Sequence, residues 1–193
     1  MAMAELGNGL HDAKRHEDAL SVYEAELSLM RRLGDSAANI LRVQGNLAVT
    51  YQALGHPEKA LRMKRDVYSR RMKLNGEEDR ETVRETVNYA MSLIDLKRFA
   101  EARSVLRKMV PVARRVLGEG HLLTLNMRWI YAEALYRDDD ATLDDLREAV
   151  TTLEEIEPTA RRDLGGAHPN VRSMEESLQQ AQAVLRAREA GES

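Results

Sequence analysis

Histidine and the carboxylates of aspartate and glutamate are the side chains of this 193-residue chain that could hold a metal ion, because the chain has no cysteine. The five histidines are His11, His16, His56, His121 and His168. None follows another at the three- or four-residue spacing that places two imidazoles on one helical face, and His11 and His16 are five residues apart. The sequence therefore predicts no metal site, and nothing in it indicates a bound cofactor.

The acidic segment 136–145 is a second candidate for chemistry, since it carries five aspartates. A calcium-binding loop needs a glycine at its sharp turn and a closing bidentate glutamate, and this segment has neither. We expect a solvated acidic loop. No glycine-rich phosphate loop, H-E-x-x-H motif or Ser-His-Asp set appears either. We therefore predict that the chain is not an enzyme.

Basic residues gather on two predicted helices and could form a convex surface for RNA or anionic lipid: Lys59, Arg62, Lys64, Arg65, Arg70, Arg71, Lys73, Arg103, Arg107, Lys108, Arg114 and Arg115. No aromatic stacking platform for bases is interleaved with them, and the formal net charge is −3. No apolar run approaches the roughly 20 residues that span a bilayer. We predict no nucleic-acid partner, no membrane and a cytoplasmic location.

The elements that carry these residues are predicted to be helices in a repeating arrangement. Aromatic residues make up only 4% of the chain and only four prolines occur, while Ala, Leu, Arg and Glu favour helix. The period is about 42 residues. Asn46, Leu47, Ala48, Tyr51, Leu54 and Ala60 are followed 42 positions later by Asn88, Tyr89, Ala90, Leu93, Leu96 and Ala102.

Small residues and glycines mark each repeat. Gly7, Ala48, Ala90 and Ala132 on first helices, and Ala19, Ala60, Ala102 and Ala149 on second helices, are expected where neighbouring helices approach closely. Gly34, Gly76, Gly118 and Gly165 each follow a long helix, and we expect them to be left-handed helix caps. Pro111 is expected to bend its helix.

The predicted fold is all-α: a right-handed α-solenoid of about four helix-turn-helix repeats and a C-terminal capping helix, forming one array over residues 1–193. The repeats are expected at 4–35, 38–77, 80–119 and 122–166. First helices (A helices) are predicted at 4–14, 38–54, 80–96 and 122–137, second helices (B helices) at 16–33, 57–75, 98–117 and 144–164, and the cap at 170–189. Segment 136–145 adds either an enlarged turn or one more helical turn. Because the chain begins without a capping residue, we expect a fragment of a longer array.

The sequence resembles tetratricopeptide repeats of the kinesin light chain type. The resemblance covers essentially the whole chain and is carried by NLAVTYQALG (46–55), EKAL (58–61), EDAL (17–20), AEAR (100–103) and LGGAHPNV (164–171). It implies a concave groove, lined by the A helices, that binds extended peptides or partner helices.

The resemblance also implies which side chains line that groove: Arg42, Asn46, Val49, Gln52, Arg84, Asn88, Met91, Asn126, Trp129, Glu133 and Tyr136, with Asn8, His11, Asp95 and Arg137 beside them. Arginine and asparagine would donate hydrogen bonds to a peptide backbone or an acidic side chain, and Trp129 and Tyr136 would be aromatic anchors. In the alternative interpretation, Asn side chains tie helices to loops, the arginines are solvated, and Trp129 packs against the last helix.

Two functions follow from this prediction. The first is a scaffold or adaptor that holds a peptide or helix of a partner protein in the groove. The second is an assembly module that self-associates through its convex face or array ends, because the second and third repeats are basic and the fourth is acidic.

Overall fold

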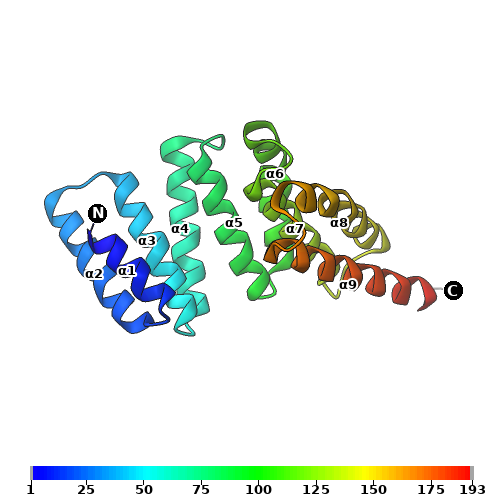
Figure 1. Cartoon of the computed structure of the whole chain (residues 1–193), viewed down its shortest axis with the longest axis horizontal. Helices are drawn as coiled ribbons and strands as arrows, with labels where there is room; N and C mark the ends of the chain where they lie inside the picture. Colours follow the sequence, from blue (N-terminus) through cyan, green and yellow to red (C-terminus); the bar gives the residue numbers. More distant parts are fainter. Residues whose placement is uncertain (1, 192–193) are drawn as a thin grey trace. The chain divides into compact units, whose positions relative to one another are not determined.

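The computed structural model describes residues 2–191, which form helices without any β-strand (Figure 1). The helices are α1 (Ala2–Asp12), α2 (His16–Leu33), α3 (Ala37–Ala53), α4 (Pro57–Asn75), α5 (Arg80–Asp95), α6 (Phe99–Leu117), α7 (Leu122–Tyr136), α8 (Leu143–Leu164) and α9 (Pro169–Gly191). Every predicted helix is present, with bounds within two residues of those expected. The all-α prediction is confirmed over the described residues.

The described chain divides into two compact units, residues 1–76 and residues 77–193. The first contains the helix pairs α1–α2 and α3–α4, and the second contains α5–α6, α7–α8 and the additional helix α9. Within each unit the A helices are neighbours: α1 lies against α3, α5 against α7, and α7 against α9. The single array over residues 1–193 stays a prediction.

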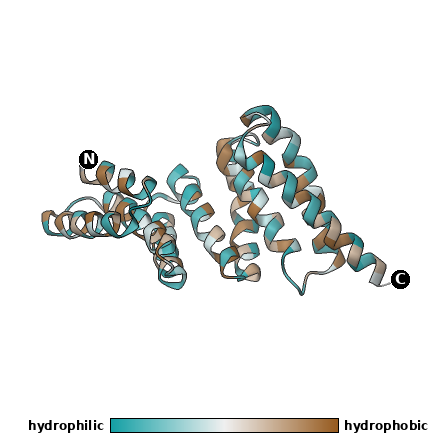
Figure 2. Ribbon diagram, turned by 60° about the horizontal axis from the view of Figure 1, so that its bottom comes forward, coloured by the Kyte–Doolittle hydropathy of each residue, from teal (hydrophilic) through white to brown (hydrophobic). Residues whose placement is uncertain are grey.

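Apolar and polar residues are interspersed along the ribbons (Figure 2), and most helices bury one face and expose another. In the first unit, the buried apolar side chains meet in one cluster: Ala19, Tyr23, Leu27, Val43, Leu47, Tyr51 and Ala60. In the second unit, the largest fully buried side chains come from all four paired helices: Leu93, Leu106, Met109, Leu125, Met127, Ile130, Leu135, Leu146, Leu153 and Ile156. A helix pair with one apolar stripe becomes stable by stacking on the next pair.

The predicted small positions are all buried. Ala48, Ala90, Ala132, Ala19, Ala60, Ala102 and Ala149 are all fully buried. Gly7 is buried as well, and a Cβ atom built on it would lie only 2.5 Å from Cε1 of Tyr23. Since nothing larger than hydrogen fits there, α1 and α2 depend on glycine at this position.

The four glycines that follow the B helices all have positive φ angles, as predicted, but only one has the expected left-handed conformation. Gly34 has φ 67° and ψ 35°. The other three have φ between 82° and 88° and extended ψ between 141° and 177°. That region is essentially restricted to glycine, so these positions turn the chain sharply away from the helix axis.

The insertion in the fourth repeat is both a longer turn and a longer helix. The turn between α7 and α8 covers residues 137–142, whereas the equivalent turns cover 13–15, 54–56 and 96–98. Helix α8 has 22 residues, against 18 or 19 for α2, α4 and α6. Its start is fixed by a capping box, in which the Thr142 hydroxyl accepts from the Asp145 N–H and the Asp145 carboxylate accepts from the Thr142 N–H.

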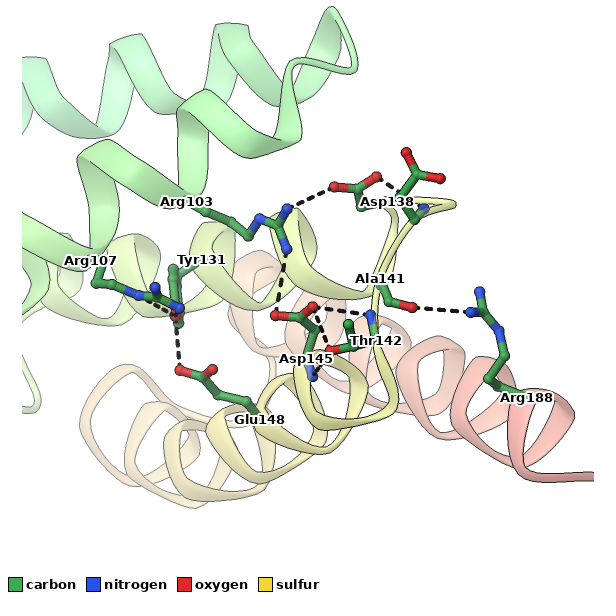
Figure 3. A network of polar contacts seen from close by, with 10 residues as sticks. Arg103, Arg107, Tyr131, Asp138, Ala141, Thr142, Asp145, Glu148 and Arg188 are labelled. Atoms are coloured by element: carbon green, nitrogen blue, oxygen red, sulfur yellow. Dashed lines mark hydrogen bonds and ion pairs between the residues drawn. The ribbon is translucent and has the colours of Figure 1, made fainter. Parts of the chain in front are cut away.

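Arginines from two other helices hold this turn in place (Figure 3). Arg103 of α6 donates to Asp138 at 3.1 Å and pairs with Asp145 at 3.5 Å. Arg188 of α9 donates to the carbonyl oxygens of Ala141 and Asp139. The expectation of a solvated acidic loop is therefore wrong for Asp138 and Asp145, which are half-buried and form ion pairs with Arg103.

Candidate functional site

The polar side chains of α1 and α3 surround a small hollow in the first unit. Its volume is about 250 Å³, and its lining residues are Asn8, His11, Asp12, Tyr23, Asn46 and Val49. We call it the α1–α3 hollow. Four of these six residues were predicted for the groove, and the structure brings them together. Asp12 and Tyr23 were missed, because neither is marked by the repeat pattern that selected the others.

Hydrogen bonds orient the two amides of the α1–α3 hollow. The buried Tyr23 hydroxyl donates to Asn8 Oδ1 at 2.6 Å, and Asn46 Nδ2 donates to the same oxygen at 3.2 Å. Burial raises the pKa of the Tyr23 phenol, and the nearby carboxylates of Glu26 and Asp12 raise it further. The phenol therefore stays protonated and continues to donate to Asn8.

The two groove arginines differ from the prediction, because each already has a carboxylate partner. Arg42 lies 3.7 Å from Oε1 of the buried Glu26. Arg84 lies 2.5 Å from Glu81 and 3.2 Å from the buried Glu85. An acidic ligand at these positions would have to compete with those carboxylates.

Asn88 takes part in the same arrangement as Arg84. Its Nδ2 donates to Oε2 of Glu85 at 3.1 Å. A carboxylate only accepts hydrogen bonds, so the Asn88 amide must direct its nitrogen toward Glu85 and its oxygen elsewhere. Asn46 and Asn88 are equivalent positions on α3 and α5, and both are oriented by a neighbour within their own unit.

Helix α9 forms hydrogen bonds with three of the predicted groove residues of the fourth repeat. Asn170 Nδ2 donates to Asn126 Oδ1 at 2.7 Å, Trp129 Nε1 donates to Ser177 at 2.9 Å, and the Tyr136 hydroxyl donates to Gln180 at 3.2 Å. Tyr136 is only 5% exposed. The structure thus has the alternative arrangement for Trp129, in which it packs against the last helix.

The repeat register explains this outcome for Trp129 and Tyr136. Trp129 and Tyr136 lie 42 positions after Val87 and Ile94, which are buried core residues of α5. They belong to the stripe that faces a neighbouring helix and not to the stripe of Asn46 and Asn88. Comparing the register residue by residue would have separated the two stripes from sequence.

Glu133, Gln52 and the exposed apolar residues complete the predicted set. Glu133 is mostly covered, and burial raises the pKa of its carboxyl, while Arg137 pairs with it at 3.5 Å. Gln52 accepts a hydrogen bond from Lys64. Val49 and Met91, at equivalent positions on α3 and α5, are 39% and 43% exposed.

Histidines serve the structure in ways that their spacing does not reveal. His121 and His168 accept through Nδ1 from the N–H groups of Leu123 and Asn170, at the starts of α7 and α9. The rings of His11 and His16 lie 4.7 Å apart across the α1–α2 turn, although no helical spacing joins them. Within residues 2–191, no group of three or more His, Asp or Glu side chains is arranged to hold a metal ion.

The predicted basic surface is interrupted by burial. Lys64 is only 6% exposed, and Arg71 is buried with its NH2 donating to the Ala38 carbonyl at 2.8 Å. Because both side chains are buried, neither contributes charge to the predicted basic surface. None of the described helices combines the length and the apolar character needed to cross a membrane.

Family models of the tetratricopeptide repeat match two parts of the chain, residues 1–73 and residues 88–122, which together exceed half of its length. The chain belongs to the tetratricopeptide repeat family. The first segment covers α1 to α3 and most of α4, and the second covers the second half of α5 and all of α6. A search of curated proteins finds no significant match.

Solved structures of kinesin light chain-like repeats have the same fold. Two crystal structures of a kinesin light chain-like protein of Podosopora anserina, with nearly identical TPR-like repeats, match with TM-scores of 0.80 and 0.78. Their sequence identities are 19% and 20%, and the matches cover 99% of this chain and 88% and 89% of those chains. BtubC (BKLC) from P. vanneervenii matches with a TM-score of 0.71 and 16% identity, covering 98% of this chain and 80% of that one. The predicted TPR-like solenoid of the kinesin light chain type is confirmed as a fold.

Proposed function

We propose that the chain is an adaptor that binds a peptide or a helix of a partner protein on the surface of its A helices. Tetratricopeptide repeats serve as protein-interaction scaffolds, and family membership supports that general role. The resemblance to kinesin light chain-type repeats supports the more specific use of the A-helix surface.

The observation that carries the proposal is an exposed apolar side chain at the same repeat position of two A helices, α3 and α5. Val49 on α3 and Met91 on α5 occupy equivalent positions and remain largely exposed, although nearly all other residues of this size on these two helices are buried or half-buried. Each follows an oriented amide, Asn46 or Asn88, by three residues on the same helical face. Covering apolar side chains stabilises a complex by about 25 cal/mol per Å² of buried apolar surface.

The oriented amides supply the polar half of such a surface. The side-chain nitrogen of each amide donates within its own unit, from Asn46 to Asn8 and from Asn88 to Glu85. The amide oxygens therefore remain as acceptors for N–H groups of a bound segment. We leave Arg42, Arg84, Asn126, Trp129 and Tyr136 out of the proposed contact set, because carboxylates or α9 engage them.

The test is a peptide-display selection against the whole chain, followed by binding measurements with variants. In Val49→Glu/Met91→Glu, we expect the affinity for selected peptides to fall at least tenfold, about 1.4 kcal/mol. The matched control is Leu29→Glu/Val116→Glu, which places the same charges at similarly exposed apolar positions on the B helices α2 and α6. Equal losses in both variants, or none in the first, would refute the A-helix surface.

Self-association through the convex face or the array ends stays the alternative prediction. Light scattering over a dilution series separates the two functions. A monomer at all concentrations supports the adaptor, whereas a dimer that persists in high salt supports the assembly module and excludes charge attraction between copies as its cause.

A further inference from the structure

The α1–α3 hollow has a net acidic character. Its lining includes the carboxylate of Asp12 but no lysine or arginine. Arg42, which influences the Tyr23 phenol from nearby, pairs with the buried Glu26. Asp12 also ends helix α1, where the helix dipole contributes further negative potential.

The hydrogen-bonding groups left in the hollow are mainly acceptors. Asn8 Oδ1 already accepts from Tyr23 and Asn46. The Asn46 oxygen makes no side-chain hydrogen bond among the described residues, and within residues 2–191 the Asp12 carboxylate has neither a hydrogen bond nor an ion pair. A donor with a positive charge would meet both groups.

The size of the hollow selects a single side chain. Pockets for drug-sized molecules have volumes of about 300 Å³ or more, and this hollow has about 250 Å³. Val49 lies on its rim as an exposed apolar wall. A long side chain with an apolar stem and a polar head matches such a site, because the stem covers apolar surface while the head keeps its charge solvated.

We propose that the α1–α3 hollow receives a lysine or arginine side chain of the bound partner segment, with its head at Asp12 and Asn46 and its stem along Val49. This inference rests on the proposed function and names a chemical feature of the partner. A carboxylate or phosphate would be repelled by Asp12. The site therefore favours a segment with a basic residue over the acidic ligand that Arg42 and Arg84 indicate from sequence.

The first experiment uses the blocked amino acids N-acetyl-arginine amide, N-acetyl-lysine amide and N-acetyl-glutamate amide as probes of the ¹⁵N-labelled whole chain. We expect the two basic probes to shift the side-chain amide resonances of Asn8 and Asn46 and the glutamate probe to leave them in place. Asp12→Asn should weaken this binding by about two- to fivefold, the range for an exposed ion pair. Glu17→Gln, which removes an exposed carboxylate elsewhere in the first unit, is the control and should bind normally.

The outcome that overturns the inference is an equal response to the basic and glutamate probes, no response, or unchanged binding in Asp12→Asn. The peptide selection separates this failure from that of the proposed function. Selected peptides that need Val49 and Met91 but carry no basic residue would refute the hollow's specificity alone. Perturbation of Asn8 and Asn46 by the arginine probe, with no peptide bound at the A helices, would refute the adaptor proposal alone.

Discussion

The ring of Tyr23 lies against the backbone of Gly7, so closely that an added methyl group would stand 2.5 Å from Cε1. Tyr23 cannot retreat easily, because it is buried in the core of the first unit and its hydroxyl is bonded to Asn8. We expect Gly7→Ala to destabilise the chain by about 1–3 kcal/mol, the usual cost of overpacking.

Gly9→Ala is the control for that substitution, because it lies on the same helix with nothing within 4 Å of its Cβ position. It should be neutral or stabilising by up to about 1 kcal/mol. Chemical denaturation of both variants provides the comparison. Equal stabilities would show that α1 and α2 can separate without cost.

Lys64 occupies a core position of its repeat, and replacing it with leucine should stabilise the chain. The equivalent residues in other repeats are Tyr23, Leu106 and Leu153, all buried. Exchanging a buried charge for a well-packed apolar side chain is often stabilising, by about 1 kcal/mol or more. Lys73→Leu, on the exposed face of α4, should change stability by less than about 0.5 kcal/mol. A lower melting temperature for Lys64→Leu would contradict this prediction.

The turns between A and B helices of the first three repeats have a positive φ angle at one position, which is Lys14, Gly55 or Lys97. A left-handed conformation costs an L-residue roughly 1–2 kcal/mol. Lys97→Gly should therefore stabilise the chain by about 0.5–1 kcal/mol after the greater flexibility of glycine is counted. The reciprocal change, Gly55→Lys, should destabilise it. Denaturation midpoints that move in the same direction would exclude backbone strain as the cause.

Asp145 should make the stability of the chain depend on acidity. The Thr142 N–H, together with the Thr142 hydroxyl and Arg103, holds the pKa of Asp145 below its ordinary value of 3.8. The contribution of the ionised Asp145 carboxylate to the free energy of unfolding is therefore complete above pH 3.8. It disappears as the pH falls through the lowered pKa. We expect Asp145→Asn to be less stable than the native chain at pH 7 and to approach it in strong acid.

Asp144→Asn is the adjacent control for the acid dependence, since the Asp144 side chain is almost entirely exposed. Unfolding in denaturant at pH 7 and at about pH 2, below the ordinary aspartate range, measures both differences. A stability gap that stays the same at the two pH values would show that the carboxylate charge of Asp145 is unimportant.

The helices could be predicted from sequence because local patterns determine them. The glycine after each B helix (Gly118, for example), the apolar spacing and the alanine positions recur from repeat to repeat. Each recurrence supports the same assignment of helices. The polar contacts were harder to predict. Arg42 lies beside Glu26, and Asn126 beside Asn170, only because separate helices bring them together.

Two further relationships could not be predicted from spacing along one helix. His11 and His16 appear unrelated by helical spacing, yet the turn between α1 and α2 brings their rings within 4.7 Å of each other at a tilt of 55°. Arg103 was grouped with a possible basic surface, but it pairs with Asp138 of the turn at residues 137–142 and with Asp145 at the start of α8. Sequence patterns assign a residue to an element, and the partner on another element decides its role.

The three polar contacts between α7 and α9 affect which helix can pack against α7. Apolar stripes recur in every repeat and would accept any neighbour of similar shape. Asn126, Trp129 and Tyr136 instead each require a matching polar group on α9, spread over three turns of the helix. A helix without polar groups at these three places would leave Asn126, Trp129 and Tyr136 unmatched, so that these contacts favour α9 over a purely apolar neighbour.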